Sequence, residues 1–286
     1  MLQTDRRVVW VQSRRGKKMK KTEQKKKGGA KKPSDSPYET EYLPTRVSTF
    51  DKMMDTGGLE RGSTLLLAGG CGSGKSIFAM QCAYNAALNG ERVVHFTFDE
   101  DPVRVKRHVY NSFGWDIQAL EDKKMLAMQK INPYDIARSI EATIKERSIE
   151  DVIESIRSVK LDTKEVTMPF HPDWVIIDSL SALSVAFSDK LKYRAYLNVL
   201  FDSLRSYNSV NLVVTEAEQE PNVYSRSGVE EFLVDGVMVF YNIRMESIRT
   251  RAIEILKLRF SDHMKKLVPF KITKDGIVIY LEEQVF

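Results

Sequence analysis

A short stretch at residues 69–76 has the residue types and the spacing of a phosphate-binding loop. It reads GGCGSGKS and fits the pattern G-x-x-x-x-G-K-[ST]. The glycines let the backbone curl so that successive N–H groups point at phosphate oxygens, and the following helix adds its positive end. In such a loop Lys75 reaches the β- and γ-phosphates, and the Ser76 hydroxyl ligates Mg²⁺. The alternative, a Gly-rich turn that contains Lys-Ser by chance, is disfavoured by the apolar run before it and the helical pattern after it.

Acidic side chains follow the next strand-like run, residues 92–98. In sheets of this kind the site lies at the carboxyl ends of the strands, where a carboxylate can orient and deprotonate an attacking water. We assign that role to Glu100, with Asp99 assisting. The alternative is that the acids only begin the next helix, with Asp101 as its cap and Pro102 as its first residue. Both interpretations can hold together, because the cluster contains three acids.

A second apolar run, residues 174–178, ends in Asp178. An apolar strand that ends in Asp, at this separation from a phosphate-binding loop, is typical of the Walker B pattern, in which the Asp holds Mg²⁺ near the loop serine. Many buried strands end in Asp, so this prediction depends on the phosphate-binding loop about a hundred residues earlier in the chain. Residues 211–216 form a further strand, whose polar end can sense the γ-phosphate or be a strand terminus only.

These residues need a scaffold of alternating strands and helices to position them. The pattern predicts strands near residues 64–68, 92–98, 174–178, 211–216 and 237–241, helices over residues 75–89, 136–145, 149–159 and 193–207, and a loop over residues 161–172. Towards the end, short links join strands at 251–258, 268–273 and 277–281, with a hairpin turn at 274–276. The predicted fold class is therefore α/β, a mostly parallel sheet flanked by helices with a C-terminal antiparallel extension.

The net charge of +5 is unevenly distributed. Residues 1–32 carry thirteen Lys/Arg against two acids, a net charge of +11, which leaves −6 for the remainder. Such a segment cannot bury enough apolar surface to offset its ordering entropy, so residues 1–40 are predicted to be a basic, disordered tail and residues 41–286 the folded domain. The tail is either an arm that binds nucleic acid or an acidic partner, or a solvated extension, and Met19 is an alternative start.

Composition narrows the class of protein further. No apolar run approaches the roughly 20 residues of a membrane span, and the amino terminus lacks the apolar core of a secretory signal. The two cysteines, Cys71 and Cys82, do not support a disulfide framework, and a reducing cytoplasm fits best. The histidines and cysteines show no spacing typical of metal ligands.

The segment 254–265, EILKLRFSDHMK, resembles the EILKLRGTSHMK segment of the KaiC family, a branch of the RecA-like ATPases. The likeness extends over residues 44 to 281, and the architecture resembles that of single-domain KaiC-like proteins of archaea. Further stretches that carry it are Gly58-Leu59, the phosphate-binding loop, Thr97-Phe98-Asp99-Glu100, Ser112-Phe113-Gly114-Trp115-Asp116, Ile177-Asp178-Ser179, Gly228-Val229-Glu230-Glu231-Phe232 and Pro269-Phe270-Lys271-Ile272-Thr273. The resemblance implies a RecA-like P-loop NTPase fold.

The family resemblance also implies a hexameric ring with ATP and Mg²⁺ at the interfaces between subunits. By position, the residues that would hold the phosphates and the metal are Gly72, Ser73, Gly74, Lys75, Ser76 and Ile77, with Ser112 near the nucleotide. The neighbouring subunit would supply Lys257, Leu258, Arg259, Ser261, His263 and Thr273. Lys257 and Arg259 alternate on one strand and share a face, so both can point at the γ-phosphate, where an arginine supplied by a neighbour stabilises transition-state charge. The alternative for this pair is a solvated edge strand.

Several positions depart from the family pattern. Asp99 replaces the first of two family glutamates, so base chemistry is slow or rests on Glu100. Lys274 stands where the circadian protein has Asp, which removes a base or ribose contact. Phe260 replaces a glycine beside the proposed arginine finger. There is one KaiC domain instead of two, so a circadian oscillator function does not follow from the resemblance.

Three functions remain open on the sequence. The first is a Mg²⁺-dependent ATPase that turns over slowly in a homo-oligomeric ring and has a regulatory use. The second is an ATP-binding module in which the nucleotide sets the oligomeric state with negligible turnover. The third is a recombination or repair accessory protein, for which the basic tail is the only sequence support.

Overall fold

The computed structural model describes residues 40–144, 168–218, 223–245 and 247–283. Most of the predicted basic tail and the predicted helix at 149–159 lie outside the described residues, as does most of the predicted loop at 161–172. Within the described part of the chain, no helix combines the length and the apolar character needed to cross a membrane.

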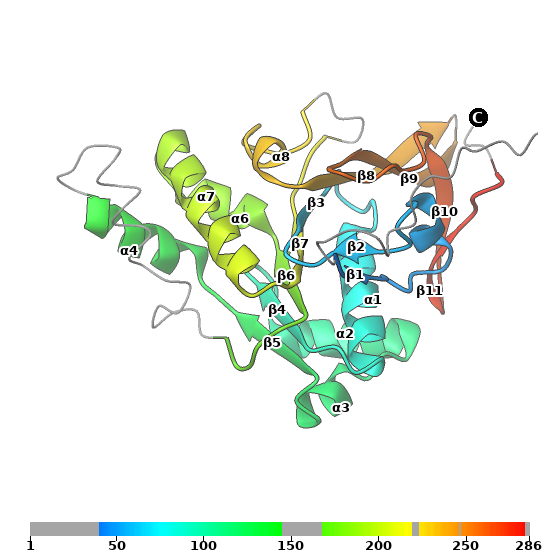
Figure 1. Cartoon of the computed structure of the whole chain (residues 1–286), viewed down its shortest axis with the longest axis horizontal. Helices are drawn as coiled ribbons and strands as arrows, with labels where there is room; N and C mark the ends of the chain where they lie inside the picture. The colour runs from blue at the N-terminus through cyan, green and yellow to red at the C-terminus, as the bar shows by residue number, and fades with distance from the viewer. Residues whose placement is uncertain (1–39, 145–167, 219–222, 246, 284–286) are drawn as a thin grey trace, which may run out of the picture. The chain divides into compact units, whose positions relative to one another are not determined.

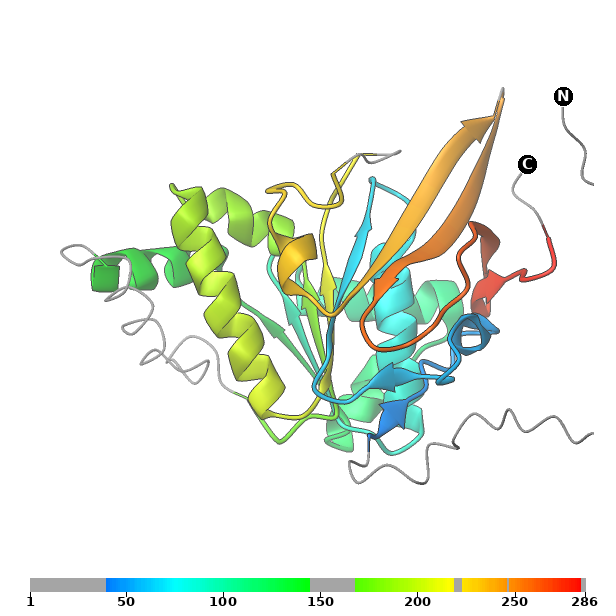
Figure 2. The same cartoon turned by 45° about the horizontal axis from the view of Figure 1, so that its top comes forward.

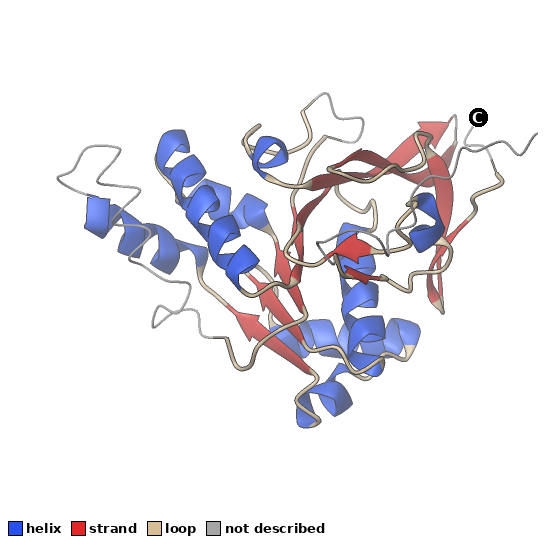
Figure 3. Cartoon of the chain, in the orientation of Figure 1, coloured by secondary structure: helices blue, strands red, loops and turns tan. Residues whose placement is uncertain are grey.

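A single nine-stranded sheet forms the centre of the domain, with the strand order β11-β10-β9-β8-β3-β7-β6-β4-β5 (Figures 1 and 3). The parallel part consists of β3 (Thr64–Gly69), β4 (Val93–Thr97), β5 (Leu126–Lys130), β6 (Trp174–Asp178), β7 (Val210–Val214) and β8 (Gly236–Met245). The antiparallel part consists of β9 (Ile248–Leu258), β10 (Val268–Thr273) and β11 (Gly276–Ile279). The predicted α/β class, with its antiparallel end, is confirmed.

Helices cover both faces of the sheet and create two apolar cores. The helices are α1 (Lys75–Leu88), α2 (Pro102–Phe113) and α3 (Ile117–Asp122) on one face, and α4 (Pro133–Ile144), α6 (Leu180–Ala186) and α7 (Lys190–Ser206) on the other, with the short α8 (Glu230–Leu233) near β8. Alternate strand residues point to opposite faces, so Leu65 and Leu67 pack towards α1 while Leu66 packs towards α7. Strands buried on both faces are continuously apolar, which is the pattern of the sequence.

The entry to the sheet is a small layer of its own. Strand β1 (Tyr42–Leu43) pairs with β2 (Leu59–Glu60), and the 3-10 helix η2 (Phe50–Met53) lies between them in the chain. Phe50 packs edge-on against Phe78 of α1, with ring centroids 4.9 Å apart. This contact fixes the segment before β3 against the helix that follows the loop.

Helix α2 begins as its sequence predicts. The Asp101 carboxylate accepts hydrogen bonds from the backbone N–H groups of Val103 and Arg104, at 2.9 and 3.1 Å, and Pro102 is the first helical residue. Gly114 closes the helix with a φ of 72°. The capping role of Asp101 is therefore confirmed, which leaves Asp99 and Glu100 for the strand end.

The C-terminal extension is longer than the sequence indicates, and it reaches the loop helix. Strands β8 and β9 pair along their whole length, and Figure 2 shows this orange hairpin extending beyond the other strands. The β10–β11 hairpin turns at residues 274–275, as predicted, and the backbone N–H of Ile277 donates to Gln81 Oε1 of α1 at 2.7 Å. The extension therefore packs on α1, the helix that follows the phosphate-binding loop.

Gly69 ends β3 at a point where the backbone of β8 passes very close. A Cβ atom at Gly69 would lie 2.1 Å from the carbonyl oxygen of Phe240, at a φ of 149°. We expect Gly69→Ala to lower the free energy of unfolding by about 3 kcal/mol or more, because main-chain atoms must move. Urea unfolding measures this loss.

Gly90 is the matched control for this substitution. It also has a positive φ, 87°, but nothing lies within 4 Å of its Cβ position. Gly90→Ala should therefore lose only about 1 kcal/mol, the cost of backbone strain alone. Equal losses for the two variants would contradict a steric role of Gly69.

Candidate phosphate-binding site

The loop between β3 and α1 is held in shape by its own hydrogen bonds. Ser73 is fully buried, and its hydroxyl donates to the carbonyl oxygen of Gly70 at 2.8 Å. Gly74, the residue before α1, has a φ of 108°, which favours glycine. The Ser73 side chain thus shapes the loop, and its contribution to a phosphate site would come from its backbone N–H.

The ammonium group of Lys75 is enclosed by this loop. Its Nζ donates to the carbonyl oxygens of Gly69 and Gly70, both at 2.9 Å, and the residue is only 7% exposed. Removal from water lowers the pKa of Lys75, an effect that the negative charges of Asp178 and Glu216 oppose. A cation in such a place, bonded to neutral carbonyls, is well suited to an anionic ligand.

Asp178 stands at the end of β6, beside Ser76 at the start of α1. Burial raises the pKa of Asp178 to about 6, and the hydrogen bond from Ser76 together with the charge of Lys75 offsets only part of this effect. A carboxylate that protein groups leave under-compensated, next to a serine hydroxyl, is a donor set that suits a hard cation such as Mg²⁺. Among the described residues there is no cluster of three or more Asp, Glu, His or Cys that could hold a metal by itself.

Two hydrogen bonds with the Thr97 side chain hold the backbone of Glu100 just after the end of β4. The Thr97 hydroxyl donates to the Glu100 carbonyl and accepts from the Glu100 backbone N–H, both at 3.1 Å. In the sheet Thr97 pairs with Asp178 of β6, so the two strand ends lie side by side. Burial, and then the charges of Glu216 and Glu100, raise the pKa of Asp99. The acids predicted from the sequence therefore meet at one edge of the sheet.

A cavity of about 620 Å³ brings these groups together. It is lined by the loop helix, by the ends of β4, β6 and β7, and by one face of α2; the lining residues include Lys75, Ser76, Ile77, Asp99, Glu100, Ser112, Asp178 and Glu216. Ser112 and Ile77 thus line the same cavity as Lys75. A cavity of this size fits a nucleotide.

His95 also lines this cavity and was not predicted as a site residue. Its side chain is 3% exposed, and neither ring nitrogen has a hydrogen-bond partner. Burial lowers the pKa of His95 to about 4, so the ring is neutral at pH 7. In the sequence, His95 occupies one position of an apolar strand, and nothing in the local pattern distinguishes it from a core residue.

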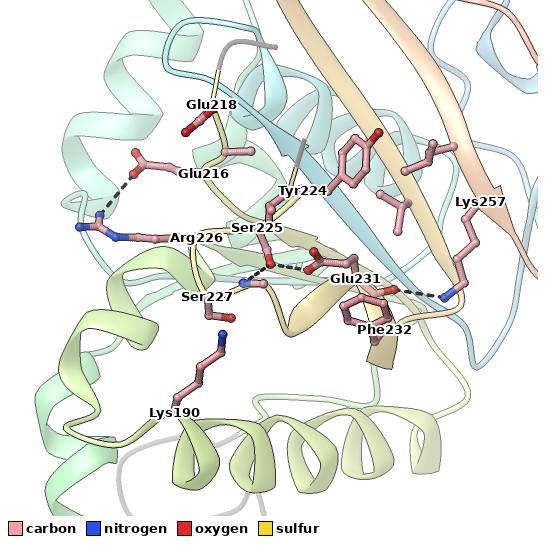
Figure 4. A pocket seen from close by; sticks show the side chains of 15 residues that line it. Lys190, Glu216, Glu218, Tyr224, Ser225, Arg226, Ser227, Glu231, Phe232 and Lys257 are labelled. Carbon is pink, nitrogen blue, oxygen red and sulfur yellow. Dashed lines mark hydrogen bonds and ion pairs between the residues drawn. The ribbon is translucent and has the colours of Figure 1, made fainter. Parts of the chain in front are cut away.

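Lys257 lies away from the loop of its own chain. Its Nζ donates to the carbonyl oxygens of Val234 and Glu231, at 2.7 and 3.2 Å, on the wall of a wider cavity of about 1260 Å³ (Figure 4). Burial, and then the charge of Arg259, lower the pKa of Lys257. Glu216 lines this cavity as well as the smaller one.

The other residues that the resemblance assigns to a neighbouring subunit also have contacts away from the 620 Å³ cavity. Arg259 contacts Asp235 at 3.4 Å and lines a small cavity of about 200 Å³ with Leu258 and Ser261. The backbone of His263 forms an isolated antiparallel β-bridge with that of Met54. The Thr273 hydroxyl donates to the Gly276 carbonyl within the β10–β11 turn. None of the late residues implied by the resemblance lines the 620 Å³ cavity of its own chain.

One arginine of the extension does reach the loop. Arg251 of β9 donates from Nε to the carbonyl oxygen of Gly72 at 3.1 Å. No local pattern indicates this contact, because it joins residues 179 positions apart. A late strand therefore touches the phosphate-binding loop within one chain.

Comparisons with known proteins agree on a family. The family model described as "ATPase: KaiC" matches residues 43–284. The chain is 36% identical over 229 residues to the circadian clock oscillator protein KaiC of Parathermosynechococcus lividus, covering 78% of this chain and 40% of that protein. It is 34% identical over 240 residues to the circadian clock protein KaiC3 of Synechocystis sp., covering 84% and 45%. The chain spans less than half the length of these curated relatives.

A solved structure matches over a larger share of its length. The crystal structure of a KaiC-like protein from the hyperthermophilic archaeon Pyrococcus horikoshii OT3 has a TM-score of 0.67 to this chain and 28% sequence identity. The match covers 85% of this chain and 100% of that one. The expected likeness to a single KaiC-like domain is therefore confirmed.

The raised pKa of Asp178 predicts a pH-dependent stability. Because its folded-state pKa, about 6, lies above the usual value of 3.8, ionising this carboxyl destabilises the fold above pH 6, and this cost disappears below about pH 4. We expect Asp178→Asn to raise the free energy of unfolding of the nucleotide-free protein by up to about 2 kcal/mol at pH 7 and by almost nothing at pH 4.

Urea unfolding at the two pH values measures this difference. Asp275→Asn, in the exposed β10–β11 turn, is the control. Its effect on the free energy of unfolding should be the same at pH 4 and pH 7. A gain for Asp178→Asn that is the same at both pH values would contradict the environment described for this carboxyl.

Proposed function

The chain belongs to the KaiC family of RecA-like ATPases, and on that premise we propose that it is a Mg²⁺-dependent ATPase that hydrolyses ATP slowly between the subunits of a hexameric ring. The observation that carries the proposal is the 620 Å³ cavity, where the loop lysine, the loop serine and four carboxylates at strand ends meet. That the chain is a KaiC/RecA-type ATP-binding protein follows from the family itself.

Lys75 is the proposed phosphate contact of the loop. Its two hydrogen bonds to Gly69 and Gly70 occupy the ammonium only with neutral carbonyls. A charge-assisted bond to a phosphate oxygen is stronger than such a contact, so the ammonium has reason to turn to a bound triphosphate. The loop N–H groups and the start of α1 add attraction for the same anion.

Ser76 and Asp178 are the proposed holders of Mg²⁺. Both present oxygen atoms to the same part of the cavity, and Asp178 lacks full compensation of its charge by protein groups. When bound, the metal supplies positive charge against the β- and γ-phosphates. The Ser76 hydroxyl, which donates to Asp178 in the free protein, would turn its lone pairs to the metal.

Glu100 is the proposed base for the attacking water. The two hydrogen bonds with the Thr97 hydroxyl hold its backbone just after β4, and Glu100 lines the cavity there. Asp99 is one methylene shorter than a glutamate and is the weaker candidate, assisting through its charge. Slow turnover is expected because this shorter side chain leaves proton transfer from the attacking water to Glu100 alone.

Lys257 and Arg259 are the proposed contribution of a neighbouring subunit. They lie on cavities that are separate from the loop of their own chain. The contacts that hold them now are backbone carbonyls for Lys257 and a partly exposed Asp235 for Arg259, and a γ-phosphate would compete well with both. A head-to-tail ring brings such residues to the next subunit's loop.

The base role of Glu100 is tested by removing its charge. Glu100→Gln should lower phosphate release by about a hundredfold or more and leave nucleotide binding in place, because the amide keeps the shape but cannot take a proton. Asp99→Asn, at the neighbouring position, should have a smaller effect. Phosphate release and binding of a fluorescent ATP analogue are measured on the same samples, and unchanged release in Glu100→Gln would favour the ATP-binding assembly module.

The contribution of a second subunit is tested by mixing two inactive variants. Lys75→Ala removes the loop cation and Arg259→Ala the proposed finger, so each variant alone should be nearly inactive. After subunit exchange, about a quarter of the interfaces in a random ring combine an intact loop with an intact finger, and activity should return in proportion. Phosphate release before and after mixing gives the result.

The control for mixing pairs two changes on the same side of the interface. Lys75→Ala with Glu100→Gln leaves every loop side defective, so this mixture should recover no activity. Recovery in neither mixture, with subunit exchange shown independently, would contradict the assignment of Arg259 to the site of a neighbouring subunit.

A further inference from the structure

Phe260 has two properties that are unfavourable in an isolated chain. Its side chain is 96% exposed, and its φ is 61°, a left-handed conformation that a bulky residue adopts rarely. Each property costs free energy, through contact of the ring with water and through backbone strain. Glycine, which the family segment has here, would avoid both costs.

Hydrogen bonds hold the residues on both sides of Phe260. On one side, the backbone N–H of Arg259 donates to the carbonyl oxygen of Asp235 at 2.9 Å. On the other, the Ser261 hydroxyl donates to Asp55 Oδ1 at 2.7 Å. The ring is thus held out from the body between two fixed neighbours.

Helix α2 has a face that could receive such a ring. None of its residues is buried, and Val103 and Tyr110, two turns apart on one face, are 68% and 56% exposed. Arg107, between them, is also exposed. The opposite face of α2, with Val105 and Val109, lines the 620 Å³ cavity.

We propose that Phe260 packs on the α2 face of a second copy of this chain, against Val103, Arg107 and Tyr110. The inference rests on the proposed function, because Arg259 is there assigned to the neighbour's cavity, and α2 is one wall of that cavity. The residue next to Arg259 would then lie near the same helix, whose outer face carries Val103, Arg107 and Tyr110. An aromatic ring between an arginine and a tyrosine gains from both ring stacking and cation–π contact.

The proposal explains why a phenylalanine is retained at a position that suits glycine. Packing against a second copy removes the ring from water and offsets the backbone strain. A small number of buried aromatic side chains carries most of the free energy of an interface. Phe260 would therefore strengthen assembly at the expense of the stability of the single chain.

The experiment measures assembly and stability on the same variants of the full chain. Sedimentation velocity with Mg²⁺ and AMP-PNP, a non-hydrolysable ATP analogue, gives the concentration of half-assembly. We expect Phe260→Gly and Tyr110→Gln each to raise that concentration about tenfold or more. The double variant should be little worse than either single variant, because both remove the same contact.

Thermal unfolding without nucleotide gives the second readout. Phe260→Gly should raise the Tm by roughly 2 °C or more, since the backbone strain at the φ of 61° is relieved. Leu88→Gln is the control: Leu88 is 58% exposed at the far end of α1 from the loop, and its replacement should leave assembly unchanged.

The outcomes separate this inference from the proposed function. If the wild type assembles and Phe260→Gly assembles equally well, or if the effects of Phe260→Gly and Tyr110→Gln simply add, the Phe260 contact is wrong and the ring stands. If the wild type stays a single chain at every concentration with the nucleotide bound, both are wrong. Loss of assembly in Phe260→Gly with a raised Tm and an unaffected Leu88→Gln supports the contact.

Discussion

The site depends on one buried cation, Lys75, and on a partly buried carboxylate, Asp178, whose charge the protein alone does not fully compensate. The ammonium of Lys75 is enclosed with two carbonyl oxygens at 2.9 Å, and the pKa of Asp178 is raised to about 6 because its surroundings do not compensate its ionised form. These opposite charges, with those of Asp99 and Glu216, lie at one edge of a sheet whose interior is apolar. The rest of the fold serves to hold them there: β3 and α1 position the lysine, and β4 and β6 bring in the acids.

The sequence predicted the parts of the site that depend on local patterns. The loop, the cap of α2 at Asp101 and the acidic ends of β4 and β6 each follow from residue types at fixed spacing within one segment. Parallel strands that end in polar residues must meet at one edge, so their proximity was predictable too. For this reason the cavity that contains Lys75, Glu100 and Asp178 agrees with the prediction made from the sequence.

The remaining features depend on contacts between distant segments. The polar residues Asn242 and Arg244 interrupt the apolar run of β8, so the sequence suggested a shorter strand than the one that pairs with β9. His95 reads as one more residue of a buried strand, although it lines the cavity. The roles of the late residues came only from family resemblance, and a single chain leaves those roles as proposals because they need a second subunit.

Strand β9 has contacts at both ends that matter for more than one site. Near its start Arg251 touches Gly72 of its own loop, and near its end Lys257 lies on the side assigned to the neighbour. Six residues of extended chain separate them, roughly 20 Å. In the proposed ring this strand would connect each ATP site to the next. ATP bound at one site would then alter the ATP affinity of the neighbouring site. Such coupling would appear as cooperativity, with a Hill coefficient above one for ATP.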